Sequence, residues 1–174
     1  IAIYLIDSNT FMEAARSYYS FEFGTRFWNF LVKKAEEEIV ASIDKVLDEI
    51  NKGDDKLKIW ANEQFKEYFS STKKEEVFNK YAEVVRWSES MKDHYKRQAI
   101  DEFMKEDNAD PWLIAFALTK QPYLEIVTFE KYNQYKKIEI PIPNVCEKFN
   151  IKCCDLFEMM KKLKFNFNDW NEVE

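Results

Sequence analysis

The chain alternates between short continuous apolar runs, which predict buried strands, and apolar residues at helical spacing, which predict helices. Residues 1–6 form an uninterrupted apolar run that stops at Asp7, which is typical of a strand buried on both faces of a parallel sheet. We therefore expect a sheet of short parallel strands. Beyond the first, strands are predicted at 39–41 and 125–128, and 136–140 and 151–153 are candidates for a fourth and a fifth.

Apolar residues at helical spacing fill the segments between these strands. Thr25 and Ser42 are placed to cap helices, and Asp110 followed by Pro111 is a usual helix start. An aromatic-rich loop at 18–24 separates the first two helices. The helices predicted by the spacing cover residues 8–17, 26–38, 43–50, 110–118, 143–149 and, after a cap at Asp155, 156–163.

Strands that alternate with helices imply an α/β fold with a central parallel sheet and right-handed crossovers. The length suits one domain, and we treat residues 1–174 as a single unit. Residues 54–109 are rich in charge and carry aromatic residues at helical spacing, so they are expected to form a helical insert within that domain. The presence of only 2 Gly and 4 Pro argues against a turn-rich all-β protein.

Charge and cysteine content indicate which partners and which cellular compartment suit the protein. A net charge of −6 argues against a nucleic-acid binder held by overall charge. The basic stretch at 131–164 ends in Lys161, Lys162 and Lys164, which are either a solvated face or a contact for a phosphate backbone. The three cysteines have no zinc-site spacing, and no apolar run approaches the length of a membrane span. Together these features favour a reducing, cytoplasmic location.

Acids stand at several junctions where a predicted strand or helix ends or begins. Asp7 follows the first strand, Asp110 starts a helix, and Glu130 lies two residues beyond the strand at 125–128. On the helix at 43–50, Glu49 lies about 110° from the centre of the apolar stripe and Asp48 about 150°. Glu49 is therefore the acid better placed to lean over a sheet edge.

Each of these acids also has an ordinary structural explanation. Asp7 can cap the helix that follows it, a role that Ser8 or Asn9 could fill equally well, and Asp110 can be a cap worth about 1 kcal/mol. Glu49 and Glu130, taken singly, can be solvated surface residues. The functional interpretation rests on their joint position, because ligands bind outside the carboxyl ends of strands in open α/β sheets.

Converging carboxylates without a neutralising base repel one another by several kcal/mol, which a bound divalent cation would relieve. Oxygen ligands suit Mg²⁺ or Mn²⁺, and such a cation activates water for phosphate displacement. The sequence offers no Ser-His-Asp set, no Cys-His pair and no glycine-rich phosphate loop. Metal-assisted hydrolysis is thus the chemistry that the sequence supports.

The segments that carry these acids resemble the PIN domain family. The resemblance lies in Tyr4–Asn9, the helix with Glu49, Ala109–Ala115 and Ile126–Glu130, and it spans residues 2 to about 165. A PIN-like subgroup also shares an aromatic-rich stretch like Tyr18–Trp28 and a tail like Val145–Phe149 and Leu156–Met159.

The resemblance implies a three-layer α/β/α nuclease fold whose metal-binding and catalytic acids are Asp7, Glu49, Asp110 and Glu130. Asn9 and Thr128 match polar positions near the metal. Most PIN domains have Asp where this chain has Glu130, and compact members lack the insert at 54–109.

On this basis the expected function is Mg²⁺- or Mn²⁺-dependent hydrolysis of RNA, as the toxin of a toxin–antitoxin pair. The expected partners are substrate RNA, an antitoxin protein and a second copy of the chain in a homodimer. One alternative is a catalytically idle PIN-like module that binds RNA or protein. A second is a metal-dependent phosphatase, against which Asn9 counts because such sites usually have a second acid at that position.

Overall fold

A computed structural model describes residues 4–168 and contains an all-parallel sheet in the order β3-β2-β1-β4-β5. Leu5 and Ile6 in the central strand β1 are fully buried, as expected for a strand covered on both faces. The predicted α/β fold with a central parallel sheet is confirmed. The strands are β1 (Tyr4–Ile6), β2 (Val40–Ile43), β3 (Phe69–Ser70), β4 (Glu125–Val127) and β5 (Lys152–Cys154).

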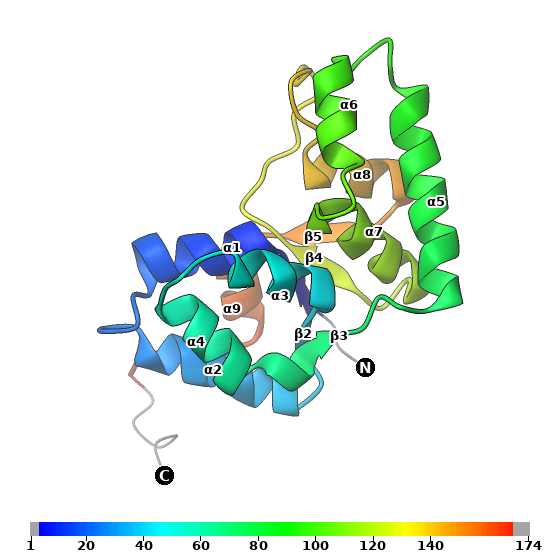
Figure 1. The fold of residues 1–174 in the computed structure, drawn as a ribbon. Helices are drawn as coiled ribbons and strands as arrows, with labels where there is room; N and C mark the ends of the chain where they lie inside the picture. The colour runs from blue at the N-terminus through cyan, green and yellow to red at the C-terminus, as the bar shows by residue number, and fades with distance from the viewer. Residues whose placement is uncertain (1–3, 169–174) are drawn as a thin grey trace.

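Helices cover both faces of the sheet, in keeping with three α/β/α layers. Figure 1 shows α1, α2 and α9 on one side and α5, α7 and α8 on the other. No helix in residues 4–168 is long and apolar enough to cross a bilayer. The helices are α1 (Ser8–Glu13), the π-helical η1 (Ala14–Tyr18), α2 (Thr25–Glu36), α3 (Asp44–Asn51), α4 (Lys56–Glu63), the 3₁₀ turn η2 (Lys66–Tyr68), α5 (Glu75–Ser90), α6 (Arg97–Phe103), α7 (Ala109–Thr119), α8 (Ile142–Phe149) and α9 (Leu156–Lys162).

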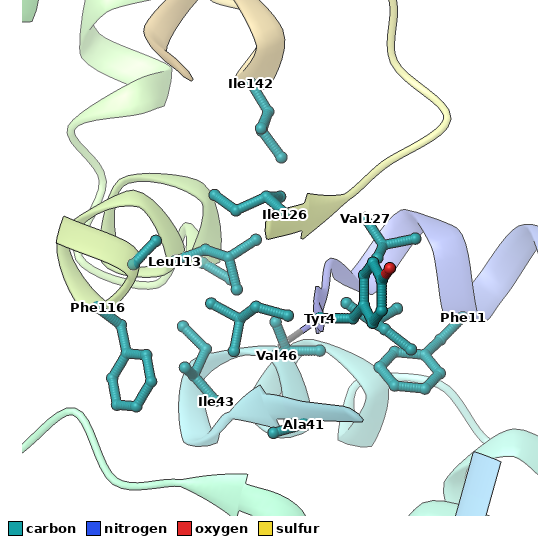
Figure 2. Close-up of a cluster of buried hydrophobic side chains, with 14 of the residues drawn as sticks. Tyr4, Phe11, Ala41, Ile43, Val46, Leu113, Phe116, Ile126, Val127 and Ile142 are labelled. Atoms are coloured by element: carbon teal, nitrogen blue, oxygen red, sulfur yellow. The ribbon is translucent and has the colours of Figure 1, made fainter. Parts of the chain in front are cut away.

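The hydrophobic core lies between the sheet and helices α3, α7 and α8. Ile126 of β4 lies between Leu113 of α7 and Ile142 of α8, and Val46 of α3 packs close by (Figure 2). All four side chains are at most 1% exposed. Helix α7 is apolar on nearly all sides because it packs against the sheet and also along α5. The central helix predicted from residues 110–118 is therefore confirmed.

Two predictions about the strands and the insert need correction. Residues 136–140 form an irregular segment with a bend at 138–139 instead of a strand. The N–H of Lys96 donates to the carbonyl of Lys137 (2.8 Å), so this segment contacts the insert. The candidate strand at 151–153 is confirmed as β5, and the sheet has one strand that the sequence does not predict: β3 lies within the insert and pairs with β2, with Phe69 opposite Ser42. The insert at 54–109 is thus mainly helical but also extends the sheet.

Two predicted helix caps are also wrong. Ser42 lies inside β2, where its buried hydroxyl donates to the carbonyl of Ile6 (2.6 Å), so its polar group is satisfied within the sheet. Helix α3 accordingly begins at Asp44, one residue later than predicted. Thr25 is the first residue of α2, and Gly24 precedes it as the cap residue. The cap predicted at Asp155 is confirmed, as a capping box with Glu158.

Strands β1 and β4 are neighbours although β2 and β3 lie between them in sequence. The chain therefore reverses its winding direction between β1 and β4, and this is the topological switch point of the sheet. In open α/β folds, the crevice at the carboxyl ends of the two strands that flank this point is where ligands bind. Asp7 follows β1 and Thr128 follows β4, so both lie at this crevice.

Candidate functional site

Asp7 is held at the junction of β1 and β4. Its backbone N–H donates to the carbonyl of Val127 (3.1 Å). One carboxylate oxygen accepts from the N–H of Thr10 (2.7 Å), which makes Asp7 the cap of α1, and the other accepts from the hydroxyl of Thr128 (2.8 Å). The side chain is 1% exposed, and burial raises the pKa of Asp7 although its hydrogen bonds lower it.

Glu49 joins three elements around this junction. One carboxylate oxygen accepts from the hydroxyl of Ser8 at the start of α1, and the other accepts from the N–H of Ala109 at the start of α7 (2.8 Å). The residue is half-buried, whereas its neighbour Asp48 is exposed. The prediction that Glu49 leans over the sheet edge and Asp48 faces solvent is confirmed. Nothing in the sequence pointed to the contact with Ser8, because it joins residues far apart in the chain.

Asp110 is not the cap of α7. That position belongs to Asn108, whose side-chain oxygen accepts from the N–H of Asp110 (2.9 Å). Within residues 4–168, the half-buried carboxylate of Asp110 has no hydrogen bond and no ion pair. Burial, followed by the negative charges of Glu130, Asp7 and Glu49, holds the pKa of Asp110 well above its ordinary value. The ordinary explanation of Asp110 as a helix cap is therefore wrong.

Glu130 links the crevice to α8. Its carboxylate accepts from the N–H of Ile142, the first residue of α8 (2.7 Å), and its own N–H donates to the hydroxyl oxygen of Thr128 (3.1 Å). Burial raises the pKa of Glu130, the bond from Ile142 lowers it, and the charge of Asp7 raises it again. Glu130 is thus half-buried and anchored by the backbone, and Thr128 connects it to Asp7.

The structure brings the four predicted acids to one crevice. The pKa of Asp110 responds to the charges of the other three, and no ion pair in the described part of the chain includes any of the four. Beside Asp110 and Glu130 lies a cavity of about 130 Å³, bordered by α6 and residues 138–141. The crevice therefore concentrates negative charge next to an open space.

The donor set suits a hard divalent cation in its chemistry, because it consists of carboxylate oxygens, none of which forms an ion pair within residues 4–168. Burial raises the pKa of Glu130 more than the charge of Lys136 lowers it. Across residues 4–168, however, no three His, Cys, Asp or Glu side chains are arranged as a ready metal-ligand group. Protein donors already hold Asp7, Glu49 and Glu130, which keeps these side chains apart. Mg²⁺ normally retains several waters and needs only one or two direct carboxylates, so this spacing is compatible with such an ion.

Comparison with protein-family models identifies the family of this chain. A family model described as a domain of unknown function, DUF4411, matches residues 4–167. The chain belongs to the DUF4411 family. No curated protein and no solved structure matches it. The family description states no activity for this DUF4411 domain.

The remaining predicted site residues lie in different surroundings in the DUF4411 fold. Thr128 is 2% exposed and touches Asp7 directly, whereas Asn9, in the first turn of α1, is exposed. The three lysines do not join the acids. Lys162 pairs with Glu125 (2.9 Å), the first residue of β4, at the amino edge of the sheet and opposite the crevice. The exposed Lys161 and Lys164 are close to it in sequence, and we leave all three out of the site.

Proposed function

We propose that this protein is a metal-dependent ribonuclease that hydrolyses RNA phosphodiester bonds, with Mg²⁺ or Mn²⁺ as cofactor. The observation that carries the proposal is the set of Asp7, Glu49, Asp110 and Glu130 at the switch point of a parallel sheet, with no ion pair to any of the four within residues 4–168. The resemblance to PIN domains, in both the sequence segments and the acids, supports the choice of RNA as substrate.

The contacts of each acid indicate the role that we assign to it. Asp7 and Asp110 would hold the ion, because the carboxylate of Asp110 has no hydrogen bond or ion pair within residues 4–168 and Asp7 is fixed by Thr10 and Thr128. Glu49 and Glu130 would complete the shell through water or accept a proton from the attacking water. The bound cation supplies charge neutralisation at the phosphate and a more acidic water.

We base the proposed cellular role on the same resemblance to PIN domains. PIN-like ribonucleases of this kind often act as toxins, so we propose an antitoxin protein as a partner, a homodimer as the assembly and the cytoplasm as the location. The free thiols of Cys146, Cys153 and Cys154 agree with a reducing compartment.

A catalytically idle RNA-binding module is the second candidate. It is favoured by the hydrogen bonds that already occupy Asp7, Glu49 and Glu130, and by the absence of a ready metal-ligand group in residues 4–168. Such a module would bind RNA, with or without the cation, and leave it intact.

The test compares cleavage of an RNA pool in Mn²⁺ by the parent, Asp7→Asn, Asp110→Asn and the matched control Asp48→Asn. Asp48 is an exposed acid next to Glu49 on the same helix, so its replacement controls for loss of a negative charge. We expect cleavage by the parent and the control only. Thermal melts provide a second readout: Mn²⁺ at about 100 times its Kd stabilises a binding protein by about 2.7 kcal/mol. Equal cleavage by Asp110→Asn and the parent would refute the assignment, and RNA binding without cleavage would favour the idle module.

A further inference from the structure

Three partly exposed aromatic side chains meet at the carboxyl edge of the sheet. Tyr18 ends η1, Phe129 follows β4, and Phe157 lies in the first turn of α9. The ring of Tyr18 lies 5.0 Å from that of Phe157 and 5.5 Å from that of Phe129, and the two Phe rings are 5.6 Å apart. Tyr18 is 50% exposed and Phe157 42%, so much of each ring faces solvent.

This aromatic cluster, formed by Tyr18, Phe129 and Phe157, adjoins the acidic crevice. Phe129 stands in sequence between Thr128, which binds Asp7, and Glu130. Phe157 is near because β5 is the next strand: the N–H of Thr128 donates to the carbonyl of Cys154 (3.0 Å), and α9 starts directly after that strand. The hydroxyl of Tyr19, the residue after Tyr18, also donates to the sulfur of Met160 in α9 (3.6 Å), so the end of η1 lies against this helix.

The geometry of the aromatic cluster holds the rings in place and leaves part of their surface exposed. The planes of Tyr18 and Phe157 are perpendicular, which is an edge-to-face contact, and the other two pairs are tilted by 37° and 54°. The rings therefore brace one another, and about half of Tyr18 and of Phe157 is left exposed to solvent. The neighbouring Tyr19 stacks on the buried Phe27 at 4.3 Å, which anchors the end of η1 to the core. Ordered, exposed ring faces are what sequence-tolerant binding of unpaired bases uses.

A cation borders the aromatic cluster. The side chain of Lys131 follows Glu130 in the same loop, is 76% exposed, and reaches Asp155 at 3.4 Å. Asp155 caps α9 two residues before Phe157, so the ammonium group of Lys131 lies at the start of the helix that carries this ring. A cation near aromatic rings matches the backbone and base of a single strand, which present a phosphate and a flat face together.

A protein partner fits the aromatic cluster less well. Aromatic side chains bury about 150–250 Å² each when fully covered, so three partly exposed ones offer a few hundred Å². A stable protein interface needs about 800 Å² from each partner. The size of the cluster suits one or two nucleobases better.

We propose that Tyr18, Phe129 and Phe157 form a stacking platform for the bases of single-stranded RNA next to the acidic crevice, with Lys131 contacting the adjoining phosphate. The proposal rests on the proposed ribonuclease function, and it defines the substrate as unpaired RNA whose bases flank the bond to be cut. Duplex RNA, whose bases are already stacked and paired, would not engage the platform.

The test measures RNA affinity without cleavage. Variants are made in the Asp110→Asn background, and binding of a short fluorescent single-stranded RNA is followed by anisotropy in chelator. Tyr18→Ala and Phe157→Ala should each weaken binding by about 5- to 150-fold, the range for loss of one aromatic–base stack. Tyr123→Ala is the matched control, because Tyr123 is 64% exposed and precedes β4 at the opposite edge of the sheet. Its affinity should equal that of the background.

Two additions separate stacking from simple packing. Tyr18→Leu and Phe157→Leu keep an apolar side chain but lack a ring, so they should bind as weakly as the Ala variants while their melting temperatures stay near that of the background. RNA with abasic sites should bind the background weakly and lose nothing further in the variants. Recovery of affinity in the Leu variants would overturn the platform.

The outcomes distinguish this proposal from the proposed function. If the parent cleaves RNA and the ring variants bind as tightly as the background, the platform is refuted and the ribonuclease stands; the aromatic cluster then remains as a protein contact. If the parent does not cleave but ring-dependent binding is observed, the platform stands and the ribonuclease does not. A background protein that binds no single-stranded RNA would overturn the platform directly.

Discussion

Replacing Thr128 by Val tests whether the buried hydroxyl holds the crevice together. Valine keeps the branched shape of threonine but has no hydroxyl, so Asp7 loses the donor at 2.8 Å and the N–H of Glu130 loses its acceptor at 3.1 Å. A hydrogen bond to a charged group contributes about 1.5–3 kcal/mol and a neutral one about 0.5–1.5 kcal/mol. Both Thr128 and Asp7 are at most 2% exposed, so water cannot replace the lost donor.

The expected loss of unfolding free energy is therefore about 2–4 kcal/mol near neutral pH. For a chain of this length, that corresponds to a fall in melting temperature of roughly 5–15 °C. Thr128→Ser is the control, because it keeps the hydroxyl and removes one methyl group, worth about 0.8 kcal/mol. Thermal and urea unfolding of parent, Val and Ser variants measure the difference.

The loss should also depend on pH with a definite sign. Burial already raises the pKa of Asp7 above its unfolded value, and without the Thr128 bond it rises further. A raised carboxyl pKa means that the folded state holds its proton longer, so stability falls as pH rises through that pKa. The gap between the Val variant and the parent should widen from acid to neutral pH. A Val variant as stable as the Ser variant at neutral pH would refute the proposed role of this hydroxyl.

Three further predictions concern the acids and the lysines. Asp110→Asn should stabilise the metal-free protein by about 0.5–2 kcal/mol at neutral pH, because it removes a repelled charge. Since the folded pKa of Asp110 is raised, this gain should vanish near pH 4. Urea unfolding with chelator at both pH values measures the gain, and a loss of stability at neutral pH would contradict the prediction. Glu130→Gln should lose about 10- to 100-fold in single-turnover cleavage, as an outer-shell group does, and less than Asp7→Asn; equal losses would make Glu130 a direct ligand. Replacement of Lys161, Lys162 and Lys164 by Gln should leave the salt dependence of RNA binding unchanged, because Lys162 lies at the opposite edge of the sheet; a flatter slope of log Kd against log salt would return these lysines to the interface.

The candidate site was partly predictable because its acids follow strong local patterns. The apolar run that ends at Asp7 fixed a strand and its end, and the helical period correctly separated Glu49 from Asp48. Other features depended on distant partners. Asp7 and Thr128 are 121 positions apart and Ser8 and Glu49 are 41 apart, and no local pattern reports such contacts.

What the sequence determined by itself is the alternation of buried strands with amphipathic helices, since spacing of apolar residues among near neighbours decides which face each element buries. Strand order and the addition of β3 from the insert were decided only by tertiary structure. A two-residue strand such as Phe69–Ser70 has too few residues to show a period, and it exists because β2 offers it a hydrogen-bonding edge. The same packing brings Asp110 within range of three other carboxylates and leaves Lys162 at the far edge, which local spacing alone could not reveal.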